Sequence, residues 1–280
     1  MSIDRLISLM ASSTANNAYI VIDLASASRA FQSLLLADPP AGSINLFADG
    51  GALNADAVTP WLVPIPLAER SIGLLSRSWE LARHQPAVLW LKSRHDTPTV
   101  AAALASRLDV KSRDGQEWLL RFYDPRVLSD LRHDLRAQEL ADLLTPVHNW
   151  CFLDRDGALQ TLEGDDDGVA ATQPMQLCDE SFDALSLSAE ASQVSEAARV
   201  HWPDELHIPF GEKAQRLAKQ VCIEAELAGC PSLNEKVLLL WRASADETNL
   251  FSRPEWQRWR VAPIATRPAL QELLDTTHAI

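Results

Sequence analysis

The chain has 280 residues, of which 47% are hydrophobic and 22% charged, a composition typical of a soluble globular protein and not of a disordered chain. Its formal net charge of −13 repels phosphate, so we expect neither a nucleic acid nor a membrane as a partner. No apolar run reaches the roughly 20 residues of a membrane span, and the start, MSIDRLISLMASSTANN, lacks the features of a signal peptide. We therefore expect a cytoplasmic protein.

Short apolar β-type runs alternate with helical patterns up to about residue 162. This alternation predicts an α/β lobe in layers, with a mostly parallel or mixed sheet. Several runs are apolar on both faces, as in strands that helices cover on both sides. The strand candidates are residues 18–23, 44–48, 61–65, 87–92, 117–123 and 149–154. The helical patterns between them cover residues 28–37, 71–84, 98–108 and 125–144.

Two helix starts are marked by a capping side chain followed by a proline. Asp96 and Thr97 precede Pro98, and Asp124 precedes Pro125. A proline suits the first helical position because no N–H is needed there. These two boundaries are the sharpest that the sequence offers.

The chain changes character after the sixth apolar run. Three successive aspartates, Asp165, Asp166 and Asp167, lie between glycines and indicate a solvated acidic loop. Beyond it the β-type runs stop, and helical patterns cover residues 182–199, 211–229, 254–260 and 268–276, with a further helix after the Ser232–Glu235 capping box. We therefore expect an α/β lobe at residues 1–163, an acidic linker at 164–174 and a smaller all-helical lobe at 175–280.

The densest group of polar and aromatic residues is Arg121-Phe-Tyr-Asp-Pro-Arg126, between an expected strand and an expected helix. Ligands often bind at such strand edges of α/β sheets, so Arg121, Asp124 and Arg126 are candidate site residues. The architectural interpretation is stronger, because Asp124 can cap the helix and an arginine can pair with it.

No metal or cofactor site is predicted. Asp154 and Asp156 do not continue into a calcium-binding loop, and Asp156-Gly157 is typical of a hairpin turn. The histidines lack metal-ligand spacing, and the phosphate-binding and nucleophile motifs are absent. The four cysteines, without paired spacing, are interpreted as reduced core residues.

The sequence contains nine tryptophans and two tyrosines. Trp61, Trp90, Trp118 and Trp150 belong to expected strands and are interpreted as core residues. Trp256 and Trp259, beside Arg253 in a short charged helix, are candidate partner-binding residues, because Trp and Arg are enriched at interface hot spots. The alternative is that both tryptophans attach the last helices to the helical lobe.

A set of segments in the N-terminal half follows one characteristic order: Tyr19–Asp23, Leu46-Phe47, Val58–Val63, Trp79, Asp114-Gly115 and, as the best signature, Arg121-Phe-Tyr-Asp-Pro-Arg-Val-Leu128. In these segments the chain resembles the adaptor-chaperone family of bacterial type VI secretion systems, over about residues 18–162. The sequence departs from the family at Ala48-Asp49-Gly50 and at His148-Asn149.

The resemblance implies a non-enzymatic adaptor that holds the N-terminal region of a secreted toxin effector and helps to load it onto the C-terminal region of the VgrG spike. In this interpretation we assign five residues to partner binding: Arg121, Arg126, Arg253, Trp256 and Trp259. Tyr123, Asp124 and Pro125 form a structural motif in this interpretation, and no residue is catalytic.

Two other classes of protein stay open. An α/β enzyme, a transferase or a hydrolase, would use Arg121, Asp124 and Arg126 at the strand edge. A small-molecule-binding regulator would need an enclosed apolar pocket with converging polar groups.

Overall fold

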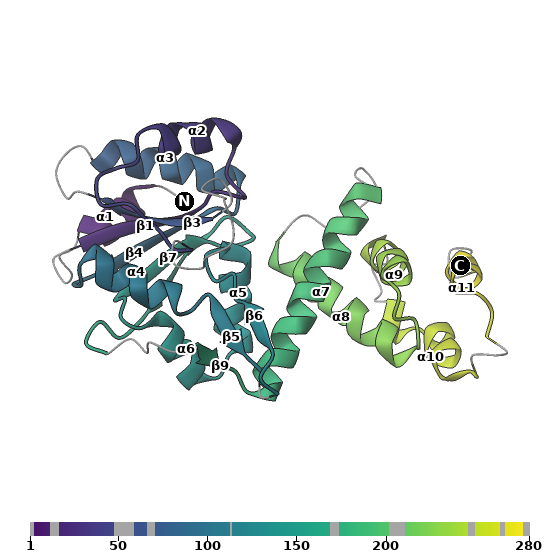
Figure 1. The fold of residues 1–280 in the computed structure, drawn as a ribbon. Coiled ribbons are helices and arrows are strands. Elements are labelled where there is room, and N and C mark those ends of the chain that lie inside the picture. The colour runs from purple at the N-terminus through teal and green to yellow at the C-terminus, as the bar shows by residue number, and fades with distance from the viewer. Residues whose placement is uncertain are drawn as a thin grey trace. The chain divides into compact units, whose positions relative to one another are not determined.

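The computed structural model describes residues 3–11, 17–47, 59–65, 71–112, 114–168, 174–201, 211–245, 250–263 and 267–276. The chain divides into two compact units, unit 1 (Met1–Phe182) and unit 2 (Asp183–Ile280), as Figure 1 shows by colour along the chain. The described helices of unit 1 are α1 (Ile3–Ala11), α2 (Arg29–Ala37), α3 (Ser71–His84), α4 (Thr97–Ala105), α5 (Pro125–Asp134) and α6 (Ala137–Leu144). Helix α7 (Asp179–His201) begins in the last residues of unit 1.

Unit 1 is built on a six-stranded sheet in the order β2-β3-β1-β4-β7-β8. Its strands are β1 (Asn17–Asp23), β2 (Ile44–Asn45), β3 (Pro60–Ile65), β4 (Val88–Ser93), β7 (Asn149–Leu153) and β8 (Leu159–Glu163). Every pair of neighbours is antiparallel, so the expectation of a mostly parallel or mixed sheet was wrong. The helix α3 does join two strands of the same direction, β3 and β4, but β1 lies between them and pairs antiparallel with both.

Both faces of the sheet are covered, as the double-sided apolar runs predicted. Helices α1, α2 and α3 lie on one face, and α4, α5 and α6 on the other (Figure 1). On the first face Trp90 packs against Trp79, with ring centres 5.7 Å apart, and donates its indole N–H to Ser78 Oγ at 2.9 Å. On the second, Trp150 donates to the carbonyl of Leu144 at 3.0 Å. Each buried indole thus has a hydrogen-bond partner, as burial requires.

A second, three-stranded sheet has the order β6-β5-β9 and contains β5 (Asp109–Lys111), β6 (Glu117–Leu119) and β9 (Met175–Gln176). The expected strand at 117–123 therefore ends at Leu119 and lies outside the main sheet. The core interpretation was also wrong for Trp118, which is 49% exposed. It was confirmed for Trp90 and Trp150, and Trp61 packs against the core while partly exposed.

The acidic segment expected as a linker is attached to unit 1 wherever the structure describes it. Asp166 accepts hydrogen bonds from Ser93 Oγ at 2.9 Å and from the backbone N–H of Arg94. Gly164 donates to the carbonyl of His148 at 3.0 Å, and a Cβ at Gly164 would lie 2.8 Å from the carbonyl oxygen of Leu144. Because β9 also pairs with β5, the boundary between the units falls after Phe182.

The described elements of unit 2 are helical. Besides α7 they are α8 (Glu212–Leu227), α9 (Leu233–Ala245), the 3-10 helix η1 (Leu250–Ser252), α10 (Pro254–Val261) and α11 (Leu270–Thr276). Small residues on α8, such as Ala218 and Ala225, are fully buried. The predicted capping box is confirmed, since the backbone N–H of Ser232 donates to Glu235 Oε2 at 3.2 Å in front of α9.

Candidate functional site

The polar residues of Arg121–Arg126 fold into a cluster with Asp23, which we call the Arg121 cluster: Asp23, Arg121, Tyr123, Asp124 and Arg126. Asp23 ends the central strand β1 and is 1% exposed. Arg121 donates from Nη2 to Asp23 Oδ2 at 3.0 Å, and its guanidinium carbon lies 5.7 Å from the centre of the Tyr123 ring. The cluster therefore ties the segment before α5 to the middle of the main sheet.

Asp124 is the N-cap of α5, as its position before Pro125 predicted. Its Oδ1 accepts from the backbone N–H of Arg126 at 2.9 Å, and its Oδ2 accepts from Arg126 Nη2 at 2.8 Å. The carboxylate is nearly buried, whereas the side chain of Arg126 is 47% exposed. Pro125 occupies the first helical position and is buried. The bonds that the Asp124 carboxylate accepts come from Arg126 and hold the start of α5. This geometry agrees with the architectural interpretation of Asp124 as a helix cap.

The pKa values in the Arg121 cluster agree with a structural role, in which the cluster holds the segment before α5 against β1. Burial acts to lower the pKa of Arg121, but the charges of Asp124 and Asp23, the ionised form that Tyr123 takes at high pH, and the hydrogen bond to Asp23 outweigh it, so this pKa is raised on balance. Burial raises the pKa of the Tyr123 hydroxyl, against the opposing effect of the Arg121 charge. The arginine thus stays charged and the tyrosine neutral near pH 7. Neither group is poised for proton transfer at neutral pH.

Asp23 is the residue that sequence reasoning did not single out for this cluster. Besides Arg121, it accepts from the backbone N–H of Ala25 at 3.0 Å and from Ser26 Oγ at 2.8 Å. A signal was present, since Asp23 is an acidic residue directly after the apolar run Ala18–Ile22. A buried charge requires a partner, but the sequence did not indicate that the partner lies 98 residues further on.

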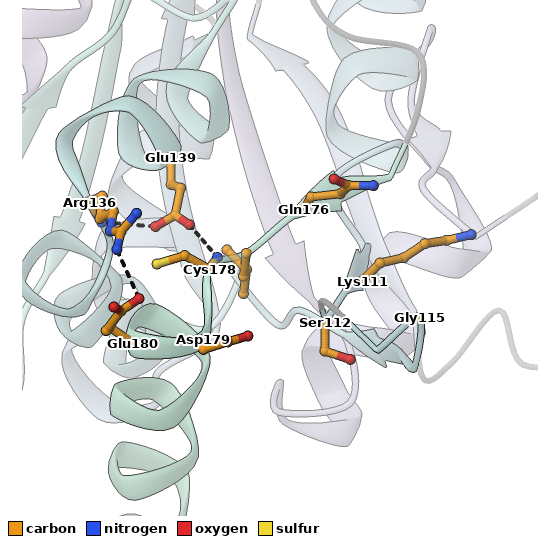
Figure 2. A pocket seen from close by; sticks show the side chains of 10 residues that line it. Lys111, Ser112, Gly115, Arg136, Glu139, Gln176, Cys178, Asp179 and Glu180 are labelled. Carbon is orange, nitrogen blue, oxygen red and sulfur yellow. Dashed lines mark hydrogen bonds and ion pairs between the residues drawn. The ribbon is translucent and has the colours of Figure 1, made fainter.

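A cavity of about 580 Å³ lies elsewhere in unit 1, where the β5–β6 hairpin, β9 and the starts of α6 and α7 meet (Figure 2). Glu139 organises one wall. Its Oε1 accepts from the backbone N–H of Cys178 at 2.7 Å, and its Oε2 accepts from the N–H of Arg136 at 3.0 Å and from Ser181 Oγ at 2.5 Å. One carboxylate therefore caps both α6 and α7.

The charged groups around this cavity largely neutralise one another. Arg136 pairs with Glu180 at 2.8 Å, and Lys111 pairs with Glu117 at 2.8 Å. Cys178 lines the cavity and is only half-buried, so the expectation of a core residue was wrong for it, whereas Cys151, Cys222 and Cys230 are buried. The sequence did not reveal this cavity, because its lining comes from distant segments: Lys111, Ser112, Gly115, Arg136, Glu139, Gln176, Leu177, Cys178, Asp179 and Glu180.

A second hollow of about 530 Å³ lies between α2 and α3 and includes Phe31, Leu81 and His84 in its lining. Neither of these two cavities contains a residue of the Arg121 cluster. The strand-edge residues that an enzyme would use therefore do not line either hollow.

The other candidate partner-binding residues lie in unit 2. Trp256 is fully buried and Trp259 is 6% exposed, and their rings stack with centres 5.4 Å apart. Trp256 donates to Glu224 Oε2 at 3.1 Å, and Trp259 donates to the carbonyl of Pro268 at 2.9 Å. Arg253 precedes α10 and is partly buried. In the structure the tryptophans attach the last helices to α8. This agrees with the alternative given above, in which both side chains pack within the helical lobe.

The described part of the chain contains neither a membrane-spanning helix nor a group of metal ligands. None of the helices there is long and apolar enough to cross a membrane. Across the described ranges, no three His, Cys, Asp or Glu side chains are grouped as metal ligands. Asp154 instead accepts from the N–H groups of Asp156 and Ala158 at 3.0 and 2.8 Å, which confirms the predicted turn.

Unit 1 is thus an α/β domain with an antiparallel main sheet, and its charged cluster joins a helix to the central strand. Residues 18–142 match the family described as a domain of unknown function (DUF4123). The match lies within unit 1 and includes the whole Arg121 cluster. No curated protein and no solved structure matches the chain.

Proposed function

We propose that this protein is a non-enzymatic adaptor that binds a type VI secretion effector and helps to load it onto the VgrG spike. The proposal starts from the resemblance of residues 18–162 to the adaptor family. The DUF4123 match at residues 18–142 supports it, because it covers nearly the same segment.

The observation that carries the proposal is the geometry of Arg121–Arg126, the best signature of the resemblance. Asp124 caps α5, and Arg121 binds the buried Asp23. This geometry makes the segment part of a rigid platform, and many protein interfaces form on surfaces whose backbone moves little.

Arg121 and Arg126 keep a second role in this proposal. Their side chains are 44% and 47% exposed while one edge of each guanidinium holds a buried carboxylate. A partner can therefore contact the exposed parts of both arginines without breaking their ion pairs with Asp23 and Asp124. Arginine is well suited to this, because its planar group carries five N–H donors.

The test is direct binding with the full-length chain. The chain is co-expressed with the toxin effector encoded beside it and with the C-terminal region of VgrG, and complexes are separated by size-exclusion chromatography. We expect the chain to elute with the effector and to join it to VgrG. The variant Arg83→Glu is the control, because Arg83 lies on the exposed surface of α3 and should leave binding unchanged.

A folded chain that captures neither effector nor spike overturns the proposal. A measured turnover of any substrate that Asp124→Asn abolishes would instead favour the enzyme alternative.

A further inference from the structure

The small sheet of unit 1 has an open edge at β6. Within the described residues, β6 pairs only with β5, in a register that places Trp118 opposite Val110. Hydrogen bonds from Ser112 N–H to Gln116 O and from Leu120 N–H to Leu108 O flank this pair. Backbone groups of an antiparallel strand point alternately toward the two sides. The backbone N–H and C=O groups of Gln116, Trp118 and Leu120 therefore point toward β5. Those of Glu117 and Leu119 point away from β5, to the open edge.

The outward backbone groups have no partner within the described residues. Glu117 and Leu119 each offer one N–H and one C=O at this edge. Natural edge strands are generally protected against pairing by charge, proline, a bulge or a covering segment. Among the residues that the structure describes, Glu117 is the one protecting charge on β6, and its carboxylate binds Lys111 across the strand pair at 2.8 Å.

Two large apolar side chains accompany this edge. Trp118 and Leu119 are each 49% exposed, and they lie on opposite faces of the strand. Trp118 is held in place by an edge-to-face contact with Phe182, with ring centres 5.3 Å apart. A fixed, half-exposed tryptophan beside unpaired backbone groups is the combination that strand addition uses, with backbone bonds for affinity and side chains for specificity.

We propose that β6 is the docking edge for an extended segment of the effector, which adds to the small sheet as a fourth strand. This inference rests on the proposed function and names the surface through which it acts. The added strand would place an apolar side chain beside Trp118 and another beside Leu119. A basic side chain would suit this face, because the exposed Asp109 lies on it beside the Lys111–Glu117 ion pair and leaves the face with one negative charge in excess.

The charge of the chain argues against a second copy as the occupant. Two chains of net charge −13 repel each other, and pairing two β6 edges would bring both Glu117 carboxylates to one short interface. A segment with basic residues has the opposite preference.

The test uses a proline at an outward-facing position. Leu119→Pro removes the N–H that would bind the added strand, but it leaves the bonds of Trp118 and Leu120 to β5 in place. Proline is tolerated at such edge positions, so we expect an almost unchanged melting temperature. Leu119→Ala is the control for the loss of the leucine side chain, because it removes the isobutyl group but keeps the N–H. In co-purification and titration with the effector, we expect Leu119→Pro to weaken binding on the order of tenfold or more, and Leu119→Ala clearly less.

The possible outcomes separate this inference from the function on which it rests. Wild-type binding that Leu119→Pro abolishes, with new hydrogen-exchange protection at the amides of Glu117 and Leu119, supports the edge. Equal binding by wild type and Leu119→Pro overturns the edge and leaves the adaptor function intact. A folded wild-type chain that binds no effector overturns both. A wild-type dimer that Leu119→Pro dissociates, with effector binding unchanged, assigns the edge to a second copy and overturns the proposal.

Discussion

Replacing Asp124 separates a structural role from a chemical one. In Asp124→Ala, α5 loses its N-cap, which costs about 1 kcal/mol. The ion pair to Arg126 is lost as well, and since that arginine is 47% exposed we assign the pair only about 0.5–1 kcal/mol. Together these give about 1.5–2 kcal/mol, or about 3–8 °C in the melting temperature of a unit of this size.

The matched variant is Asp124→Asn. Asparagine is as good an N-cap as aspartate, so the bond to the Arg126 N–H is kept and only the ion pair is weakened. We therefore expect a loss of about 0.5 kcal/mol, or about 1–2 °C. Thermal and urea unfolding of the three proteins measure these differences, and effector binding is titrated in parallel.

Two results would refute this reasoning. One is an Asp124→Ala chain that melts like the wild type, because a cap that holds α5 must affect stability. The other is an Asp124→Asn chain with wild-type stability that has lost binding or a catalytic activity, because the carboxylate would then act on a partner or substrate.

Three further predictions concern other parts of the chain. Although burial opposes it, the hydrogen bonds that Glu139 accepts lower its pKa below 4.5. Its contribution to stability is therefore present above pH 4.5 and is lost as the pH falls through the lowered pKa. The stability of Glu139→Gln, measured by urea titration, should depend less steeply on pH below 4.5 than that of the wild type. Trp256→Ala should destabilise unit 2 by about 3–5 kcal/mol, measured by calorimetry, whereas an exposed partner anchor would leave the transition unchanged. The pKa of the Cys222 thiol is raised to about 12, mainly by burial. Iodoacetamide at about pH 8 should therefore label Cys178 before Cys222. Early labelling of Cys222, detected by peptide mapping, would contradict this packing.

Local signals in the sequence located most elements but not the connections between them. The caps at Asp96 and Asp124 fixed the starts of α4 and α5, because one side chain and a proline decide a helix start. Asp156-Gly157 correctly placed the turn between β7 and β8. Strand direction has no such local signal. A buried strand is apolar on both faces whether its neighbours run parallel or antiparallel, so the insertion of β1 between β3 and β4 could not be predicted.

The candidate site could likewise be predicted only where its signal is local in the sequence. The sequence identified Asp124 and Pro125 as a helix start, and the structure agrees. It could not supply Asp23, because an ion pair across 98 residues leaves no periodicity. Trp118 was misplaced for a related reason: an alternating apolar run looks the same at the centre of a large sheet and at the edge of a small one.

The bond between Arg121 and Asp23 has a consequence for biosynthesis. The strand that ends in Asp23 leaves the ribosome early, but the guanidinium that neutralises its buried carboxylate is made 98 residues later. An uncompensated charge in that position opposes closure of the core. Unit 1 therefore cannot reach its native state before Arg121 has been added to the chain.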